Sequence, residues 1–171
     1  MQKEDGPAIS ADMPDWSREA PQRGWDPGRR LLRAIRRHQA ARARGGLGGH
    51  IAAHWWALQH RIWSIATGAE IDLRARIGGG LLIPHPNGIV IHPDAVIGPN
   101  CLIFQQVTIG VARGPGLPTI GGHVDIGAGA RILGPVRIGD HAVIGANAVV
   151  LRDVPAGAVA VGVPARIVVP S

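Results

Sequence analysis

The sequence predicts a mainly β protein, in which a parallel β-helix of hexapeptide repeats follows a short α-helical hairpin. Aliphatic residues recur every six positions from Ile71 onward, and glycine often follows directly, as at Gly98 and Gly127. Three such hexads make one triangular coil, in which the aliphatic side chains stack inward and glycine eases the corners. A helix does not explain this period, because six residues give no continuous face at 3.6 residues per turn.

The repeats fall into three runs separated by a two-residue shift and by a longer break. The inward positions that the period predicts are Ile71, Ile77, Ile83 and Ile89, then Ile91, Ile97, Ile103 and Ile109, and finally Ile120, Ile126, Ile132, Ile138, Ile144 and Val150. Small or aliphatic side chains follow most of these after four residues, and Cys101 is one of them. We expect the repeat domain, with a C-terminal tail, to occupy 69–171 and Cys101 to lie in its core.

The segment before the repeats divides into an arm and a hairpin. Residues 1–27 mix proline, glycine and charges without periodicity, which predicts a mobile arm because little apolar surface offsets the ordering entropy. Asp26 followed by Pro27 favours a helix start. We therefore predict a helical hairpin over 28–68, broken at 45–49.

Each helix of the hairpin carries an apolar stripe at helical spacing. The first stripe consists of Leu31, Leu32 and Ile35, and the second of Ile51, Trp55, Leu58 and Ile62, widened by Trp56 and Trp63. These stripes predict a hairpin with a buried side.

Length and composition set limits on the class of protein. The chain has 171 residues, 46% of them hydrophobic, with 18 Lys+Arg against 12 Asp+Glu and a net charge of +6. This length allows one domain with a small accessory element. The single cysteine excludes an internal disulfide, no run of about 18 apolar residues could span a bilayer, and the N-terminus begins acidic and polar. We expect a cytoplasmic protein.

Several segments together resemble serine acetyltransferases and related hexapeptide acyltransferases. They are "PHPNGIVI", the "FQQVTIG" strand before a glycine-rich interruption, the "IGAGARILG" coil and the terminal "GVPARIV", within a resemblance over about 28–169. The resemblance implies a left-handed β-helix that assembles as a homotrimer, with acyl donor and acceptor meeting in a cleft between subunits. It also implies acetyl-CoA or another acyl-CoA as co-substrate and no permanently bound cofactor.

The resemblance assigns the catalytic histidine to His85, just before the "GIV" triplet. A neutral imidazole is well matched near pH 7 to taking a proton from a hydroxyl. Glu70 aligns with the family's helper aspartate, and a carboxylate there would hold the imidazole tautomer and stabilise the imidazolium. Asp72 is the nearby substitute for Glu70.

Further positions are expected to contact the two substrates. His92, which repeats the "HP" pattern, and Arg113 in the glycine-rich loop are the candidate acceptor-binding residues. For CoA we expect the small residues to let the pantetheine arm approach the backbone, and the arginines to meet the nucleotide phosphates. These candidates are Gly127, Ala128, Gly145 and Ala146, with Arg131, Arg152 and Arg166. His123 and His141 are 18 residues apart and should stack on one solvent-facing side.

The sequence departs from the family where an amino-acid acceptor would bind. Gly116 and Leu117 stand where serine acetyltransferases carry an Arg-His pair, and Pro84 stands where an aspartate usually precedes the histidine. These residues leave the charges of a small zwitterion unmatched, which is costly in a buried site. The first interpretation is therefore acyl transfer to a hydroxyl of a small molecule or sugar, with free serine a poor acceptor.

Four alternatives remain open. In the first, the chain is a genuine serine O-acetyltransferase of cysteine biosynthesis. In the second, the acyl donor is an acyl carrier protein instead of CoA. The third is a zinc site like that of the related β-helix carbonic anhydrases, which need two ligands five residues apart. No two of His85, His92, His123 and His141 have that spacing, so no metal is expected. A non-catalytic docking module rests on the arginine-rich hairpin, which could face nucleic acid or an anionic membrane. We expect no nucleic-acid partner and no membrane span.

Overall fold

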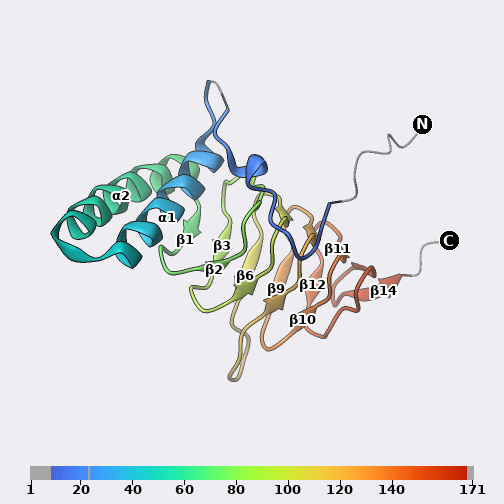
Figure 1. Cartoon of the computed structure of the whole chain (residues 1–171). Helices are drawn as coiled ribbons and strands as arrows, with labels where there is room; N and C mark the ends of the chain where they lie inside the picture. The colour runs from blue at the N-terminus through green and yellow to red at the C-terminus, as the bar shows by residue number, and fades with distance from the viewer. Residues whose placement is uncertain (1–8, 23, 169–171) are drawn as a thin grey trace.

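The computed structural model describes residues 9–22 and 24–168, which form a β-helix with a helical hairpin at one end (Figure 1). A short 3-10 helix, η1 (Trp16–Glu19), precedes the two long helices α1 (Pro27–Arg44) and α2 (Gly46–Thr67). Asp26 caps α1 and Pro27 opens it, as the sequence predicts. No helix in the described ranges is long and apolar enough to cross a membrane.

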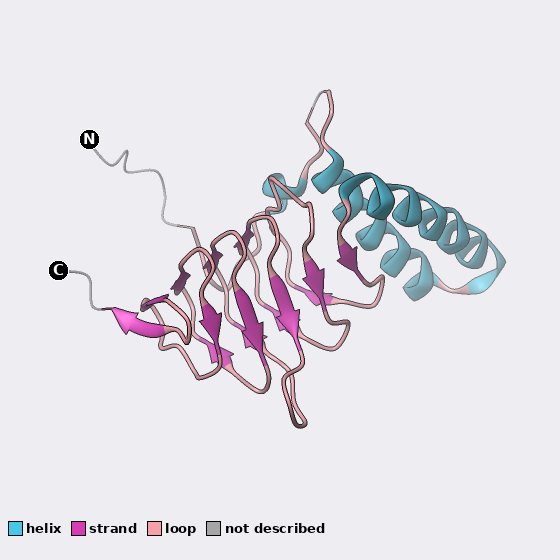
Figure 2. Cartoon of the chain, turned by 180° about the vertical axis from the view of Figure 1, so that it is seen from behind, coloured by secondary structure: helices cyan, strands magenta, loops and turns pink. Residues whose placement is uncertain are grey.

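Short strands stack into three sheets that form the three sides of the β-helix (Figure 2). The first sheet holds β1 (Glu70–Ile71), β3 (Val90–Ile91), β6 (Thr108–Gly110), β9 (Arg131–Leu133) and β12 (Val149–Val150). The second holds β2 (Arg76–Ile77), β4 (Val96–Ile97), β7 (Thr119–Ile120) and β10 (Arg137–Ile138). The third holds β5 (Leu102–Ile103), β8 (Asp125–Ile126), β11 (Val143–Ile144), β13 (Val159–Val161) and β14 (Arg166–Val168). The predicted fold class is confirmed.

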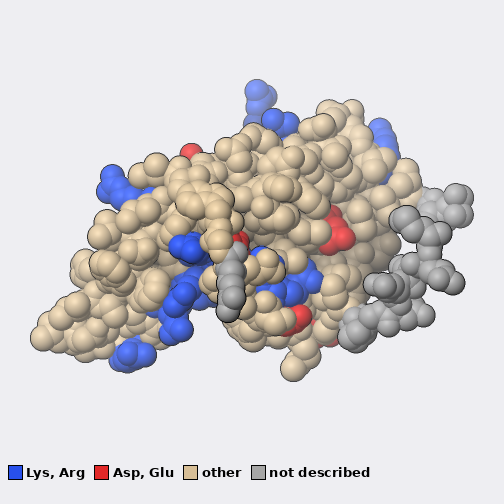
Figure 3. Space-filling view, turned by 90° about the horizontal axis from the view of Figure 1, so that it is seen from above, with Lys and Arg blue, Asp and Glu red and all other residues tan. Residues whose placement is uncertain are grey.

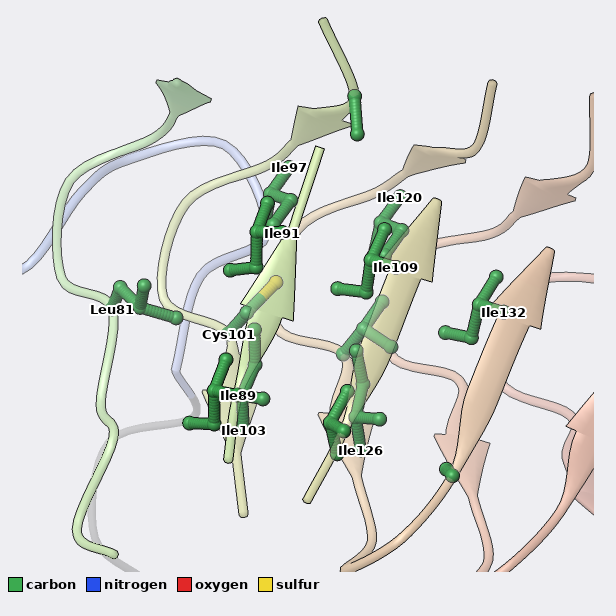
Figure 4. Close-up of a cluster of buried hydrophobic side chains, with 14 of the residues drawn as sticks. Leu81, Ile89, Ile91, Ile97, Cys101, Ile103, Ile109, Ile120, Ile126 and Ile132 are labelled. Atoms are coloured by element: carbon green, nitrogen blue, oxygen red, sulfur yellow. The ribbon is translucent and has the colours of Figure 1, made fainter. Parts of the chain in front are cut away.

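The core is a set of isoleucine columns inside the coil (Figure 4). Ile91 lies in register with Ile71 on one side and with Ile109 on the other, so each residue stacks on its equivalent in the next coil. Cys101 is fully buried among these columns, and burial raises the pKa of its thiol to about 11. The expectation that Cys101 is a core residue is confirmed.

The two-residue shift in the repeat lies at the corner between the third and first sheets. Ile83 and Ile91 are eight residues apart, and the intervening Ile89 lies beside Ala69 and Val107 rather than in the column of Ile71. The backbone N–H groups of Glu70 and Val90 donate to Ile89 and Val107 respectively, which fixes this register. The additional residues therefore enlarge one corner, the corner that carries His85.

Two further irregularities shape the β-helix. A loop at 111–118 between β6 and β7 projects from the body and is the protrusion at the bottom of Figure 1. At the C-terminal end, β14 pairs antiparallel with β13, whereas the other strand pairs are parallel. This reversal ends the parallel stack, because β14 occupies the position at which another coil would begin.

Helix α1 covers the opposite end of the core. Leu31, Leu32 and Ile35 are almost completely buried against the first coil, as their spacing predicts. Gly28 permits this approach, since a Cβ there would lie 2.5 Å from the carbonyl oxygen of Ile83.

Helix α2 packs differently from the prediction. Its buried residues are the small Gly49 and Ala53 together with Thr67, and these face α1 and the first coil. The predicted stripe of Ile51, Trp55, Leu58 and Ile62 points outward. Together with Leu47 and Ile65 it is named the α2 stripe, and each of its six residues is at least 47% exposed. The expectation that this stripe is buried within the chain is wrong, because α1 already fills the end of the core.

Part of the N-terminal segment, expected to be mobile, lies along the β-helix. Residues 10–19, the N-terminal strap, follow the corner between the second and third sheets. The buried Asn100 accepts from the N–H of Asp15 and donates to the carbonyls of Ser10 and Met13, each at 2.8 Å. Low apolar content suggested disorder, but hydrogen bonds to a built corner supply the ordering free energy that hydrophobic burial does not.

The strap ends in an ion pair that ties it to α1. Glu19 is only 7% exposed and accepts two hydrogen bonds from Arg36, at 2.8 and 3.1 Å, and one from the N–H of Leu81. Arg36 also donates to the carbonyls of Ile77 and Gly78. The pair therefore links strap, helix and first coil.

Candidate active site

His85 lies on the enlarged corner between the third and first sheets. Pro84 and Pro86 flank it, and the following proline restricts the His85 backbone to extended conformations. Pro86 is buried beneath the corner, while the His85 side chain is exposed. Below it, Asn87 accepts a hydrogen bond from Gln106 at 2.7 Å. The corner therefore holds its shape and presents the imidazole to solvent.

Successive coils align this corner into a continuous edge, the His85 ridge, which runs through 84–88, 104–106, 127–129 and 145–147. Backbone hydrogen bonds join each level to the next: Gln106 N–H to Asn87 O, Gly129 N–H to Gln105 O and Asn147 N–H to Ala128 O. The structure thus places the predicted catalytic histidine and the four small residues expected to meet pantetheine on one edge. That alignment follows from the 18-residue coil once the corner insertion is located.

The glycines of the ridge also have a packing role. A Cβ on Gly127 would lie 2.6 Å from the backbone nitrogen of Ala146, and one on Gly145 would lie 2.7 Å from the Val161 side chain. Both glycines are therefore required for close stacking of the coils, whether or not a ligand lies beside them. Ala128 and Ala146 carry the small exposed surface of the ridge.

Gln105 adds a polar group to this ridge that the sequence analysis did not select. Its Oε1 is buried and has no hydrogen-bond partner within the described ranges. A buried amide oxygen without a partner costs free energy, so a donor that reaches this oxygen, or a rotation of the side chain toward one, would stabilise the position. The only signal in the sequence was the position of Gln105 within the "FQQVTIG" segment.

A cleft of about 580 Å³ lies over the first sheet, beside the C-terminal half of α2. Its apolar walls include Val90, Pro93, Val111 and Leu133. Its ionisable groups are His60 from α2, Glu70 from β1, Asp72 and His92. The cleft therefore combines an apolar body with a few convergent polar side chains, which is typical of small-molecule sites.

Hydrogen bonds set the tautomers of both histidines in this cleft. His60 Nε2 lies 2.7 Å from the carbonyl oxygen of Ile71, which can only accept, so Nε2 carries a proton. His92 Nδ1 accepts from the Asp94 N–H at 3.2 Å, which places the proton of the neutral ring on Nε2. A hydrogen bond from the Arg74 side chain lowers the pKa of Asp72, which keeps that carboxylate ionised.

The predicted residues fall into two groups rather than one. Glu70 and His92 line the cleft, whereas His85 does not. Glu70 is exposed, and within 9–22 and 24–168 no hydrogen bond or ion pair joins it to His85. Arg113 is exposed on the projecting loop. Within one chain, the ridge and the cleft therefore lie on adjacent surfaces. A site that contains both His85 and Glu70 needs either a conformational change or a second chain.

The arginines expected at the nucleotide phosphates are all exposed. Arg131 lies on the outward face of β9 in register with Thr108 and Val149, next to the ridge. Arg166 lies on β14 and Arg152 follows β12. Only Arg131 and Arg166 belong to sheets that flank the ridge, so these two are the better placed of the three.

His123 and His141 stack on a different corner, as their spacing predicts. Their Nδ1 atoms are 2.9 Å apart, so one ring donates to the other and the neutral pair holds two different tautomers. Burial lowers the pKa of His123, and the neighbouring His141 adds to this effect. Within the described ranges, no three His, Cys, Asp or Glu side chains gather as metal ligands.

Fold and repeat define a class, the hexapeptide-repeat β-helix proteins, and comparison with known proteins agrees. Residues 118–152 match the family described as bacterial transferase hexapeptide (six repeats). A serine acetyltransferase from Synechocystis sp. is 54% identical over 108 residues, which cover 61% of this chain and 43% of that protein.

Solved structures narrow the resemblance further. A Neisseria gonorrhoeae serine acetyltransferase in complex with serine has a TM-score of 0.69 and 36% identity, covering 85% of this chain and 58% of that one. A serine acetyltransferase in complex with CoA has the same TM-score and identity, covering 84% and 58%. The predicted resemblance to serine acetyltransferases is confirmed. The chain spans about half the length of the curated relatives it matches, such as 54% of a Synechococcus elongatus serine acetyltransferase.

Proposed function

We propose that this protein is a CoA-dependent O-acetyltransferase in which His85 is the general base. The observation that carries the proposal is the His85 ridge, where an exposed histidine and the small residues Ala128 and Ala146 share one edge of the β-helix. The similar proteins are named serine acetyltransferases, and one similar structure is a complex with CoA. Both observations support an acetyl thioester as the donor.

The proposed reaction is a direct transfer. The acceptor hydroxyl oxygen attacks the thioester carbon while an imidazole nitrogen of His85 takes the hydroxyl proton. The C–S bond then breaks, and the imidazolium returns the proton to the departing CoA thiolate. Gln105 belongs to the same ridge, and its Oε1 is buried without a partner in the described chain, so a turn of this side chain toward the surface would let it accept a hydrogen bond from an amide of the pantetheine arm. Arg131 and Arg166 are the proposed phosphate contacts.

Serine is the first acceptor to test, because the relatives are serine acetyltransferases. The cleft offers the carboxylates of Glu70 and Asp72 for an ammonium group, and His92 for a carboxylate. Glu70 keeps its proposed role as the residue that orients His85, with the geometry completed between subunits.

A larger hydroxyl compound is the second candidate. The volume of the cleft exceeds what a small amino acid needs, and Val90, Val111 and Leu133 give it apolar walls. Leu117 and Gly116 supply no charge from the loop. Steady-state kinetics separate the two: a kcat/KM for serine of about 10⁴ M⁻¹s⁻¹ or more establishes serine as the acceptor.

We propose a homotrimer as the working assembly. Within one chain the ridge and the cleft are adjacent but not joined, and in a cyclic trimer the ridge of one protomer can face the cleft of its neighbour. Light scattering at micromolar concentration tests this directly, and a monomeric protein with full activity contradicts it.

The decisive experiment for catalysis measures CoA thiol release from acetyl-CoA with His85→Ala and the control His141→Asn, an exchange that the left-handed φ of His141 tolerates. Both histidines are exposed on corners of the β-helix, and only His85 lies on the ridge. We expect a loss of about 10²–10⁴ in kcat for His85→Ala and no change for the control. A folded His85→Ala protein with the wild-type rate contradicts the assignment.

A further inference from the structure

The outer face of α2 is an apolar surface without a partner in the described chain. The α2 stripe residues range from 47% exposed for Ile62 to 79% for Leu47. Their spacing of three and four residues keeps all six on one side of the helix. Exposed apolar surface of this extent marks a site of interaction with a protein or a membrane.

Tryptophan and arginine side chains border this stripe. Arg30 stacks 5.2 Å from the ring centre of Trp63, and Arg33 stacks 5.9 Å from that of Trp56. With Trp55 of the stripe, these four residues line a cavity of about 350 Å³. No carboxylate lines this cavity among the described residues. Trp25, 76% exposed, extends the aromatic surface beyond Trp63.

The charged side chains of the hairpin are all arginines, and seven of the eight belong to α1. Eight arginines and no acidic residue lie between 27 and 67. Two of them are paired, Arg29 with Asp26 and Arg36 with Glu19. The other six lack a carboxylate within 4.0 Å in the described part of the chain: Arg30, Arg33, Arg37, Arg42, Arg44 and Arg61. Figure 3 shows basic side chains gathered on and beside the helical end.

We propose that the helical hairpin binds the surface of an anionic phospholipid bilayer. Leucine, isoleucine and tryptophan on one face of a helix, with arginine beside them, are the composition of helices that lie in the membrane interface. Here Leu58 and Ile62 enter the outer acyl region, while Arg30 and Arg33 meet lipid phosphates. Tryptophan suits the boundary, because its ring is apolar and its N–H is polar.

Charge complementarity favours this partner over a second copy of the chain. A second copy brings another hairpin without acidic residues, so pairing of two hairpins leaves Arg30 and Arg33 of α1, which border the stripe, without a carboxylate to neutralise them. A nucleic acid satisfies the cations but leaves the aliphatic residues of the stripe exposed to water. An anionic bilayer satisfies both parts of the surface.

The experiment measures co-sedimentation of the full-length chain with vesicles of phosphatidylcholine alone and of phosphatidylcholine mixed with phosphatidylglycerol. We expect binding to the mixed vesicles that weakens as salt is raised. Leu58→Gln should weaken the partition coefficient roughly tenfold, whereas Leu151→Gln, equally exposed at 51% on the β-helix, should not change it. Arg30→Gln with Arg33→Gln should weaken it about 30-fold, and Arg76→Gln on β2 serves as the charge control.

Three results overturn the proposal. The first is equal or absent binding to both kinds of vesicle. The second is a loss of binding as large in Leu151→Gln as in Leu58→Gln. The third is that Leu58→Gln dissociates an oligomer in light scattering while vesicle binding is unchanged, which assigns the α2 stripe to a second copy. Acetyl transfer measured without vesicles tests the proposed function separately.

Discussion

Replacing Asn100 should release the N-terminal strap from the β-helix. Its side chain makes three hydrogen bonds to strap backbone, with Asp15, Ser10 and Met13. At about 1 kcal/mol each, their loss in Asn100→Gly destabilises the docked strap by about 3 kcal/mol. At about 1.4 kcal/mol per tenfold, the open population then rises about 150-fold.

The backbone of Asn100 makes a second variant informative. Its φ of +60° lies in the left-handed region, which glycine adopts freely and alanine does not. Asn100→Ala should therefore open the strap to a similar extent and also lower the global free energy of unfolding by about 1 kcal/mol relative to Asn100→Gly. The difference between the two variants separates the hydrogen bonds from the strain.

Cleavage by trypsin after Arg18 reports strap opening. The Arg18 guanidinium donates to the carbonyls of Gly80 and Asn100 at 2.9 and 3.0 Å, so its peptide bond becomes a substrate only when the strap leaves the surface. Asn147→Gly is the control, because Asn147 also has a left-handed φ, of +56°, but lies on another corner. A cleavage rate at Arg18 that is the same in Asn100→Gly and wild type refutes the reasoning.

Three other predictions concern buried or coupled ionisable groups. Glu19→Gln should lower the free energy of unfolding by about 3 kcal/mol in urea denaturation, because it leaves the Arg36 charge without its carboxylate; a change below about 0.5 kcal/mol contradicts this. Cys101 should resist a thiol-modifying disulfide reagent at pH 8 in the folded protein and react after denaturation, because its raised pKa and burial disfavour the thiolate; rapid labelling of native protein contradicts its core position. The lowered pKa of His123 means that the unfolded state binds its proton at higher pH than the folded state, so stability should fall as pH drops below about 6.5. His123→Asn should reduce that pH dependence, and identical pH profiles for variant and wild type rule out a His123 contribution.

The hexapeptide period determined the β-helix and most of its core. A residue repeated every six positions can only stack on its equivalents in a triangular coil, so Ile103, Ile126 and Ile144 could be placed inward from sequence alone. The same regularity put the small residues of the ridge on one edge. The period did not show which column of the core Ile89 joins. The additional residues at the His85 corner move Ile89 to another column without changing its apolar character.

The structure alone decided what each apolar stripe packs against and how the candidate site is divided. Helical spacing shows that Leu32 and Leu58 both lie on apolar faces, but only one helix can fill the end of the core, and α1 does so while the α2 stripe remains outside. The strap was missed because its contacts with Asn100 use backbone groups, which leave no pattern in side-chain chemistry. The resemblance predicted that His85 and Glu70 act together, whereas the structure places His85 on the ridge and Glu70 in the cleft. Which surface each residue occupies is set by packing in three dimensions rather than by spacing along the chain.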